Sequence, residues 1–429
     1  MTTAVNEPFS ARRAGPPMRP CRLLPPRPEG LSAHLRRLGP VPYRGRPGLL
    51  IREVEAAGLT GRGGAAFPVH RKLAVVAARP GHAVIVANGA ESEPASRKDA
   101  FLLRVAPHLI LDGLQLAAEA VGADEAYLYV HRGTETGIAR ALADRAALSH
   151  DRLPVTIAEA PPRFLAGQES ALVNWLGGGP VIPTFSPPRV SERGLEGAPT
   201  LVQNVETLAH LALIARFGPR WFRAAGTRTE PGTMLVTLHH QDGRCRIAEA
   251  RFGTPLSALL SVDARVQAWL VGGYHGTWLP VSAAGRASLD NGSLRGLGAS
   301  VGAGVLAALP ADSCGLVETA RVAGYLAAES AGQCGPCLNG LPRIAAALAE
   351  LARPRPRRAV RADIERWAGL VKGRGACSHP DGTARFVRSA LTVFQPELAR
   401  HEHGRCSAAN CGPFLPLPAD VPVHEEDWM

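Results

Sequence analysis

The feature that most constrains the fold is a strand–helix–strand pattern between residues 83 and 130. Ala83–Ala87 is a continuous β-branched and apolar run, which is typical of a buried parallel strand. Leu109–Val121 repeats apolar residues at helical spacing and stops at Gly122, and Ala126–Val130 has the composition of the next strand. Strand, helix and strand in this order predict a right-handed crossover and a layered α/β domain.

The length of 429 residues predicts about two to four domains. Residues 1–46 are rich in Pro and Arg and lack periodicity, which predicts a flexible extension. We expect the α/β domain over residues 47–228. Short apolar runs predict a small β-rich module over 229–290, helical patterns predict a helical domain over 291–400, and 401–429 is predicted to be an irregular tail.

The formal net charge of +11 does not indicate nucleic-acid binding. Only Lys72, Lys98 and Lys372 are lysines, so 48 − 3 = 45 basic residues are arginines, a bias typical of genome composition. Few aromatic residues are interleaved with this charge, unlike in a nucleic-acid surface. No apolar run reaches the roughly 18 residues that span a bilayer, and the N-terminus lacks a secretory pattern. We therefore expect a cytoplasmic protein that meets a membrane only through a partner.

A glycine-rich segment between Gly58 and Pro68 predicts an anion-binding loop. Glycines let backbone amides approach a ligand closely and adopt positive φ, which together make a nest for an anion. The side chains of Arg62 and Lys72 are candidates to neutralise a phosphate there. The alternative is a tight loop that only connects two elements.

The segment from Asn88 to Pro94 follows the Ala83–Ala87 strand directly. Ligands of open α/β sheets bind at the carboxyl ends of strands, which is where this segment is expected. Asn88 can exchange hydrogen bonds with a heterocycle, while Glu91 and Glu93 can face one cavity and bind ribose hydroxyls or an amide. A turn with solvated carboxylates remains the alternative.

Clustered cysteines in a long chain without an export signal predict a metal centre. Cys334 and Cys337 have C-x2-C spacing at the expected start of a helix, and Cys377 follows 40 positions after the second. Such thiolates can bind an iron–sulfur cluster or zinc, with helix-terminal N–H groups offsetting their charge. Buried free thiols are the structural alternative.

Five motifs in this order resemble the family of NADH-oxidising, FMN-bearing (51 kDa-type) subunits of respiratory complex I. Its relatives include the diaphorase subunits of NAD-linked hydrogenases and formate dehydrogenases, and the N-G-A-E-x-E-P variant is also similar to Rnf-type complexes. The resemblance runs from about Leu49 to about Ala399. The motifs that carry it are GRGGAAFP, NGAESEP, GQESAL, QNVETL and ESAGQCGPC.

The resemblance implies an α/β flavin-binding domain, then a small soluble-ligand-binding β-grasp domain, then a C-terminal helical bundle with a [4Fe–4S] cluster. It implies that NAD(P)H reduces FMN and that electrons then pass through the cluster to a ferredoxin-like or other iron–sulfur partner. The FMN-binding residues that it implies are Gly61, Arg62, Gly63, Gly64, Phe67, Lys72, Asn88 and Asn204. The catalytic residues that it implies around the flavin and nicotinamide are Glu91, Glu93 and Glu169, and the iron ligands are Cys334, Cys337 and Cys377.

The iron–sulfur motif departs from the family at Ala331, which replaces its first cysteine. Three thiolates remain, so the cluster is expected to be [3Fe–4S], to recruit another ligand, or to be absent. Cys406 and His403 are candidates for a fourth ligand from the tail.

The nucleotide side departs at Ala90, Gln168 and Phe164, where the family has an acidic residue, a glutamate and a tyrosine. The family's K-P-P-F is replaced by a segment ending at Arg189, which can stack on adenine or meet a 2′-phosphate, so NADPH is a candidate donor. These departures also support a second hypothesis, in which a non-catalytic relative acts as a docking scaffold for redox partners.

Overall fold

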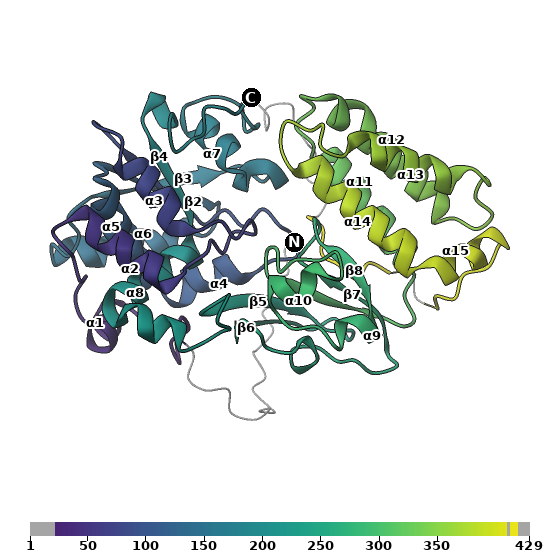
Figure 1. Ribbon diagram of the computed structural model, residues 1–429, viewed down its shortest axis with the longest axis horizontal. Coiled ribbons are helices and arrows are strands. Elements are labelled where there is room, and N and C mark those ends of the chain that lie inside the picture. Colours follow the sequence, from purple (N-terminus) through teal and green to yellow (C-terminus); the bar gives the residue numbers. More distant parts are fainter. Residues whose placement is uncertain (1–21, 410–411, 419–429) are drawn as a thin grey trace, which may run out of the picture.

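The computed structural model describes residues 22–409 and 412–418. The described chain forms an α/β unit, a second sheet and a helical region (Figure 1). The α/β unit and the helical region lie at opposite ends of the view, with the second sheet between them.

The first sheet is parallel and confirms the strand–helix–strand prediction. Its order is β3–β2–β1–β4, so the central strand β1 pairs with β2 on one side and β4 on the other. Because β1 and β4 are parallel, the carboxyl ends of both strands lie at the same edge of the sheet, although β4 is distant in sequence. The strands are β1 (Val84–Asn88), β2 (Glu125–His131), β3 (Val155–Ala160) and β4 (Thr200–Asn204).

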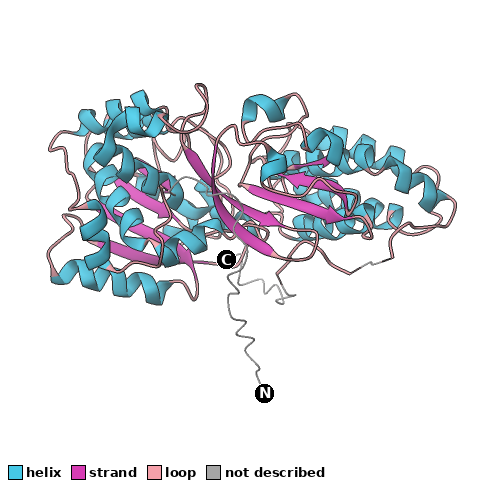
Figure 2. Cartoon of the chain, turned by 90° about the horizontal axis from the view of Figure 1, so that it is seen from below, coloured by secondary structure: helices cyan, strands magenta, loops and turns pink. Residues whose placement is uncertain are grey.

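Helices flank the first sheet (Figure 2). Ile85 and Ala87 belong to the core shared with α2, α3, α5 and α8, whereas Val84 and Val86 belong to a smaller core with α7. Both faces of β1 are therefore buried, which explains why its sequence does not alternate with polar residues. The helices are α2 (Pro47–Ala57), α3 (Val69–Ala77), α4 (Lys98–Val105), α5 (Pro107–Val121), α6 (Glu135–Ala147), α7 (Glu169–Leu176) and α8 (Val205–Arg223).

The second sheet has five strands in the order β6–β5–β9–β7–β8. Strand β9 pairs parallel with β5 and antiparallel with β7, so the sheet extends beyond the boundary that we predicted at residue 290. The short helices α9 (Val281–Ala284) and α10 (Asn291–Arg295) pack in the core on one face. The strands are β5 (Thr233–His239), β6 (Cys245–Arg251), β7 (Val266–Val271), β8 (Thr277–Pro280) and β9 (Val305–Pro310).

The helical region packs against the other face of the second sheet. Leu270 and Trp278 of the sheet share one core with Phe386 and Phe394, and the ring centroids of Trp278 and Phe394 are 5.3 Å apart. Helix α12 (Leu341–Leu351) lies within the range where helical patterns were predicted. The other helices are α11 (Gly315–Ala328), α13 (Val360–Val371), α14 (His379–Val393) and α15 (Gln395–Glu402).

The prediction that residues 1–46 form a flexible extension is wrong for residues 22–46, which the structure describes. Helix α1 (Leu31–Leu38) packs on α5 and α6, and Leu23 is fully buried. The Glu249 carboxylate accepts hydrogen bonds from the backbone N–H groups of Arg22 (2.8 Å) and Leu23 (2.9 Å). Residues before 22 lie outside the described chain. Local composition missed these contacts because their partners lie far along the sequence.

No single helix of the described chain is long and apolar enough to cross a membrane. Helices α4 and α5 meet that test only as a pair, and they are bent by 98°. Almost all of α5 is buried, since it lies in the largest core of the α/β unit.

Candidate functional site

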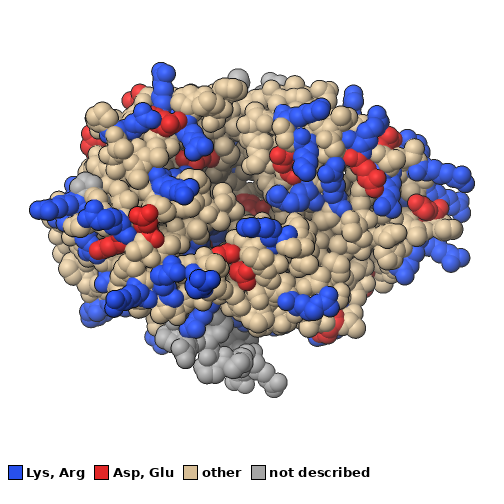
Figure 3. Space-filling model, viewed as in Figure 1, with Lys and Arg blue, Asp and Glu red and all other residues tan. Residues whose placement is uncertain are grey.

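A cavity of about 480 Å³ lies where the three parts of the molecule meet. The space-filling view shows a hollow between the α/β unit and the helical region (Figure 3). Every residue predicted to hold FMN or nicotinamide lines this cavity, and so does Cys377. These residues are Gly61, Arg62, Gly63, Gly64, Phe67, Lys72, Asn88, Glu91, Glu93, Glu169 and Asn204.

The glycine-rich loop forms one wall of the cavity. It begins after α2 ends at Gly58, and a hydrogen bond from the Gly61 N–H to the Phe67 carbonyl (2.9 Å) closes it. Gly64 has φ +108°, a conformation that favours glycine. A Cβ on Gly63 would lie 3.4 Å from the Asn204 Cβ, so the loop approaches the end of β4 closely. The loop therefore presents backbone to the cavity at the edge where strands β1 and β4 end.

The Arg62 side chain does not have the role that we predicted for it. Its guanidinium donates to the carbonyl of Thr60 (2.8 Å) and to that of Thr233 (3.2 Å), and it lies over the ring of Phe252. Arg62 is 3% exposed, and burial lowers its pKa to about 10. The side chain thus ties the loop to the second sheet, and the Arg62 backbone N–H donates to Thr207 Oγ1 of α8 (2.9 Å).

Lys72 and Glu169 form an ion pair across the cavity. The Lys72 Nζ lies 2.6 Å from Glu169 Oε2, and both side chains are partly exposed (25% and 33%). Lys72 comes from α3 and Glu169 is the first residue of α7. A phosphate near Lys72 would compete with Glu169 for the ammonium, so ligand binding and the position of Glu169 are linked.

A buried charge network lies beneath the ends of β1 and β4. The Lys98 Nζ contacts Asp99 Oδ1 (2.7 Å) and Glu206 Oε2 (3.0 Å). The Asn204 amide donates to Asp99 Oδ2 (2.7 Å) and its oxygen accepts from the Glu206 N–H (3.0 Å). Burial opposes ionisation of Glu206, but the Lys98 charge brings the pKa of Glu206 down to about 2. The network fixes Asn204, while the Asn88 amide is fixed by the Gly167 carbonyl (3.0 Å).

Glu91 lines the cavity but also caps helix α4. Its two carboxylate oxygens accept hydrogen bonds from the backbone N–H groups of Asp99 and Ala100, each at 3.1 Å. A carboxylate in this position satisfies N–H groups that the first turn leaves unpaired. Glu91 therefore anchors α4 as well as bordering the ligand space.

Glu93 joins the α/β unit to the second sheet. Its Oε2 accepts from the Tyr274 N–H (2.9 Å), and a Cβ on Gly273 would lie only 2.7 Å from the same oxygen. Burial raises the pKa of Glu93 to about 7. The absence of a side chain at Gly273 is what lets this carboxylate reach the turn between β7 and β8.

Cys334, Cys337 and Cys377 converge at the edge of the cavity. Burial, together with the nearby Cys334 and Cys377, raises the pKa of Cys337 to about 12. Cys337 lies in a π-helical turn (Pro336–Gly340) that leads into α12, and Cys377 lies two residues before α14. Three thiols at two helix starts fit an iron–sulfur cluster, because helix-terminal N–H groups stabilise its anionic charge.

The two tail residues that we considered as a fourth ligand lie elsewhere. Cys406 is grouped with Cys314 and Glu397, at the far end of the helical region. The imidazole Nδ1 of His403 lies 2.7 Å from the Ala399 carbonyl on an exposed part of the chain. The structure therefore gives no support to Cys406 or His403 as the fourth ligand.

An aromatic cluster that sequence reasoning missed closes the cavity between all three parts. Phe164, just before α7, has ring-centroid distances of 4.9 Å to His275 and 5.5 Å to His379. The His275 Nε2 lies 3.0 Å from the His379 Nδ1. His275 comes from the second sheet and His379 from α14, so only the tertiary structure brings them together. No motif in the sequence signals this contact.

The segment that replaces the family's K-P-P-F lies outside the cavity lining. Phe185 is 83% exposed and Arg189 is exposed in the same loop. Gln168 acts as the N-cap of α7, where its side-chain oxygen accepts from the Ala171 N–H (2.8 Å). Gln168 therefore stabilises the first turn of α7.

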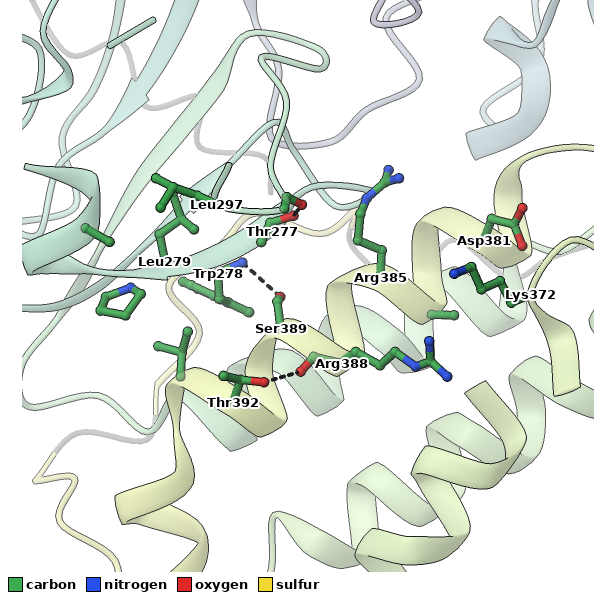
Figure 4. Close-up of a pocket in the computed structure, with 15 residues that line it drawn as sticks. Thr277, Trp278, Leu279, Leu297, Lys372, Asp381, Arg385, Arg388, Ser389 and Thr392 are labelled. Carbon is green, nitrogen blue, oxygen red and sulfur yellow. Dashed lines mark hydrogen bonds between the residues drawn. The ribbon is translucent and has the colours of Figure 1, made fainter. Parts of the chain in front are cut away.

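A second, larger cavity of about 700 Å³ lies between β8 and α14. Figure 4 shows Trp278 and Leu279 on one side, with Arg385 and Arg388 extending from α14 on the other. The Trp278 N–H donates to Ser389 Oγ (2.9 Å) across the gap. None of the residues predicted to bind a cofactor lines this cavity.

Two family models match the α/β unit and the helical region, the two parts of the chain that border the cavity. Residues 54–213 match the Nuo51 FMN-binding domain, and residues 318–401 match the NADH-ubiquinone oxidoreductase-F iron–sulfur binding region. The chain is 28% identical over 384 residues to an NADH-quinone oxidoreductase F subunit of Rhizobium meliloti (strain 1021), covering 84% of this chain and 90% of that protein. It is 28% identical over 379 residues to the NADH-quinone oxidoreductase F subunit of Streptomyces coelicolor (strain ATCC BAA-471 / A3(2) / M145), covering 84% of each.

The fold is also similar to solved structures of an NAD+-reducing [NiFe]-hydrogenase. The H2-reduced form gives a TM-score of 0.76 at 26% identity, covering 91% of this chain and 67% of that one. The air-oxidised form gives 0.78 at 26% identity, covering 90% and 68%. The cavity, the cysteines and these matches agree with one another, and the chain belongs to the family of FMN- and iron–sulfur-binding subunits typified by the F subunit of NADH-quinone oxidoreductase.

Proposed function

We propose that this chain is an oxidoreductase subunit that takes electrons from NADH or NADPH through FMN to an iron–sulfur cluster. The observation that carries the proposal is that one cavity is lined both by the glycine-rich loop and by Cys377. A flavin site and a cluster site are then neighbours, as single-electron transfer between them needs.

The residues around the cavity suit FMN. The volume of about 480 Å³ lies within the range of cofactor pockets. In the loop from Gly61 to Gly64, the N–H groups of Gly61 and Arg62 already have protein acceptors, so those of Gly63 and Gly64 and the Lys72 ammonium would hold the phosphate. Asn88 and Asn204 would meet the flavin. The Gln203 amide nitrogen, on the same wall, lacks a hydrogen-bond partner among the described residues, so it has a donor to offer. When bound, FMN would supply hydride acceptance and one-electron release.

The nicotinamide is proposed to lie over the open side of the cavity. Phe67 is 40% exposed there and offers a ring face, and Glu169 is next to Lys72. Glu91 and Glu93 would shape the site while holding α4 and the turn at Tyr274. Because the loop with Arg189 lies outside the cavity lining, we favour NADH over NADPH as the donor.

Cys334, Cys337 and Cys377 would ligate the cluster, with Ala331 leaving one iron without a cysteine. A [4Fe–4S] cluster would then use a non-cysteine ligand, and a [3Fe–4S] cluster would need none. The exposed Leu338 (60%) lies beside Cys337 and marks a face where electrons can leave.

The partner is proposed to be a ferredoxin-like or other iron–sulfur protein with an acidic surface. Basic side chains gather over the helical region in Figure 3. Such a surface would steer an acidic partner toward the cluster. A membrane complex would be reached through this partner, and the chain itself would be cytoplasmic. The exposed basic residues there include Arg343, Arg366, Lys372, Arg374, Arg385 and Arg388.

We propose the domain boundaries predicted from sequence with two changes: the α/β unit includes the packed segment from residue 22, and the second sheet extends to Pro310. We propose that this sheet is the soluble-ligand-binding β-grasp domain. In support, β5 and β9 are parallel while the outer pairs of the sheet are antiparallel, giving a mixed sheet.

Anaerobic purification with iron and sulfide, followed by absorption and EPR spectra, tests the proposal. We expect flavin absorbance, a cluster signal and NAD(P)H-dependent reduction of ferricyanide. Cys337→Ser should lose the cluster signal and keep the flavin, whereas Lys72→Ala should weaken FMN binding and keep the cluster. A chain that takes up neither FMN nor iron contradicts the proposal. If the chain binds FMN and iron but reduces no acceptor, the result would instead support the hypothesis of a non-catalytic docking scaffold.

A further inference from the structure

Two cysteines, a histidine and a glutamate come together at the far end of the helical region, away from the cavity. Cys314 is the N-cap of α11, Glu397 and His401 lie one turn apart on α15, and Cys406 follows that helix. One ligand atom from each residue lies within 4.8 Å of those of the other three. We propose that these four residues bind one zinc ion, which fastens the segment after α15 to the start of α11.

The distances between these groups match the edges of a zinc tetrahedron. The His401 Nε2 lies 3.7 Å from the Cys314 Sγ and 3.4 Å from Glu397 Oε1. With Zn–S of about 2.3 Å and Zn–N or Zn–O of about 2.0 Å, a tetrahedral site has S···N edges of about 3.6 Å and N···O edges of about 3.3 Å. The side chains therefore need little movement to surround an ion.

The orientation of His401 leaves its Nε2 facing the other ligands. The Nδ1 lies 3.3 Å from the Leu351 carbonyl, which can only accept, so the Nδ1 carries a proton. The Nε2 then faces the Cys314 Sγ, at hydrogen-bond distance, and the Glu397 carboxylate. A zinc ion would replace the thiol proton between the sulfur and the nitrogen. Metal-binding histidines commonly donate their other N–H to a backbone carbonyl in this way.

The carboxylate of Glu397 is oriented by its own hydrogen bonds. Oε1 accepts from the Ser407 N–H (2.7 Å), and Oε2 lies 3.0 Å from an Arg400 guanidinium nitrogen. Cys314, Glu397 and His401 are at most 3% exposed and already contact one another, so the ligand atoms are gathered without an ion. Cys406 is exposed, so it gives an ion access to the other three.

The ion would cross-link the C-terminal segment to the start of α11. Beyond Cys406 the described chain runs back over α11, where the Leu415 N–H donates to Glu318 and the Tyr274 hydroxyl donates to the Pro416 carbonyl. Leu415 is 1% exposed. Zinc would thus hold the start of a segment whose later residues reach the turn that contacts Glu93. This site shares no residue with the proposed cluster.

Metal analysis of the full chain tests the proposal. After anaerobic purification without chelator, we expect about one zinc per chain, and at least a fivefold loss of zinc in Cys406→Ser. Cys245→Ser is the matched control, because Cys245 is also an exposed free cysteine but lies on β6. Cys337→Ser should lose iron and keep zinc, which separates this inference from the proposed cluster.

Cobalt gives a second measurement that needs no substitution within the proposed zinc site. In the Cys337→Ser chain, Co2+ should produce thiolate charge-transfer bands in the near ultraviolet and intense visible bands typical of tetrahedral coordination. A chain without stoichiometric zinc and without these bands overturns the proposal, as does full zinc retention in Cys406→Ser. A Cys314–Cys406 disulfide found in the anaerobically purified protein also overturns it.

Discussion

At the scale of the residue, the three lysines have three different settings. Lys72 borders the cavity, Lys98 is 2% exposed among carboxylates, and Lys372 is exposed. In a chain that otherwise uses arginine, the compact ammonium of Lys98 fits between Asp99 and Glu206. This lysine supports the site from beneath, because the same network holds Asn204.

Replacing Lys98 tests the buried network. Lys98→Ala leaves Asp99 and Glu206 buried without their counter-charge, so the free energy of unfolding should fall by about 3–5 kcal/mol. Urea denaturation followed by far-UV circular dichroism measures the change. The exposed control Lys372→Ala should change stability by less than about 0.5 kcal/mol. Equal effects of the two substitutions would contradict the role given to Lys98.

Glu93 should make stability depend on pH. Burial raises the pKa of Glu93 from 4.5 to about 7, so the native state binds more protons than the unfolded state between these values. Its contribution to stability is therefore complete below about pH 4.5 and is lost as the pH rises through about 7. Glu93→Gln removes this titration and keeps an acceptor for the Tyr274 N–H.

The expected result is a pH-dependent difference between Glu93→Gln and the parent chain. The two should have similar stability near pH 4, and the variant should gain up to about 3 kcal/mol by pH 8, since one pKa unit corresponds to about 1.4 kcal/mol. Denaturation of the flavin-free chain across this range provides the measurement. A difference that does not vary with pH would show that Glu93 titrates normally.

At the scale of the element, α5 and α8 pack closely at a glycine. A Cβ on Gly113 of α5 would lie 2.0 Å from the Leu208 carbonyl oxygen of α8. Such an overlap with backbone can be relieved only by separating the helices. This contact sets how near α8, and with it Asn204 at its N-cap, lies to the first sheet.

Two glycine-to-alanine substitutions compare this contact with an open position. Gly113→Ala should lower the free energy of unfolding by about 1–3 kcal/mol or more, because the helices must shift. Gly137→Ala is the matched control on α6, where a Cβ would meet nothing within 4 Å, and it should raise stability by about 0.5–1 kcal/mol. Urea denaturation distinguishes the two, and effects of the same sign would contradict the packing argument.

At the scale of the whole molecule, Phe164 is the side chain on which the three parts converge. It contacts His275 of the second sheet and both Tyr325 and His379 of the helical region. Its backbone N–H also donates to Glu329 of the helical region (2.7 Å). Because the cavity lies between these parts, its shape depends on contacts at this point.

Removing the Phe164 ring should loosen the assembly of the three parts. Phe164→Ala is expected to destabilise the chain by about 2 kcal/mol and to make unfolding less cooperative, with the helical region separating first. Hydrogen exchange in α11 and α14 measures this. The control Phe185→Ala, at a ring that is 83% exposed, should have no effect. Unchanged exchange in Phe164→Ala would contradict the proposed role.

The sequence by itself determined the local elements and the chemistry of the site. The apolar run of β1, the helix that stops at Gly122 and the cysteine spacing of Cys334 and Cys337 are local signals, and the structure contains each of them. The residues predicted to bind FMN and nicotinamide line one cavity, and those that follow β1 and β4 do so because the carboxyl ends of parallel strands meet at a common edge. Local periodicity is enough for such inferences.

Only the tertiary structure decided what depends on partners far along the chain. It turned the Arg62 guanidinium toward Thr233, joined β9 to a sheet begun before the predicted boundary, and grouped Cys406 with Cys314. It also packed Leu23 beside residues more than two hundred positions away. A side chain's direction is set by the neighbours that folding brings to it, and those neighbours leave no mark in the adjacent sequence.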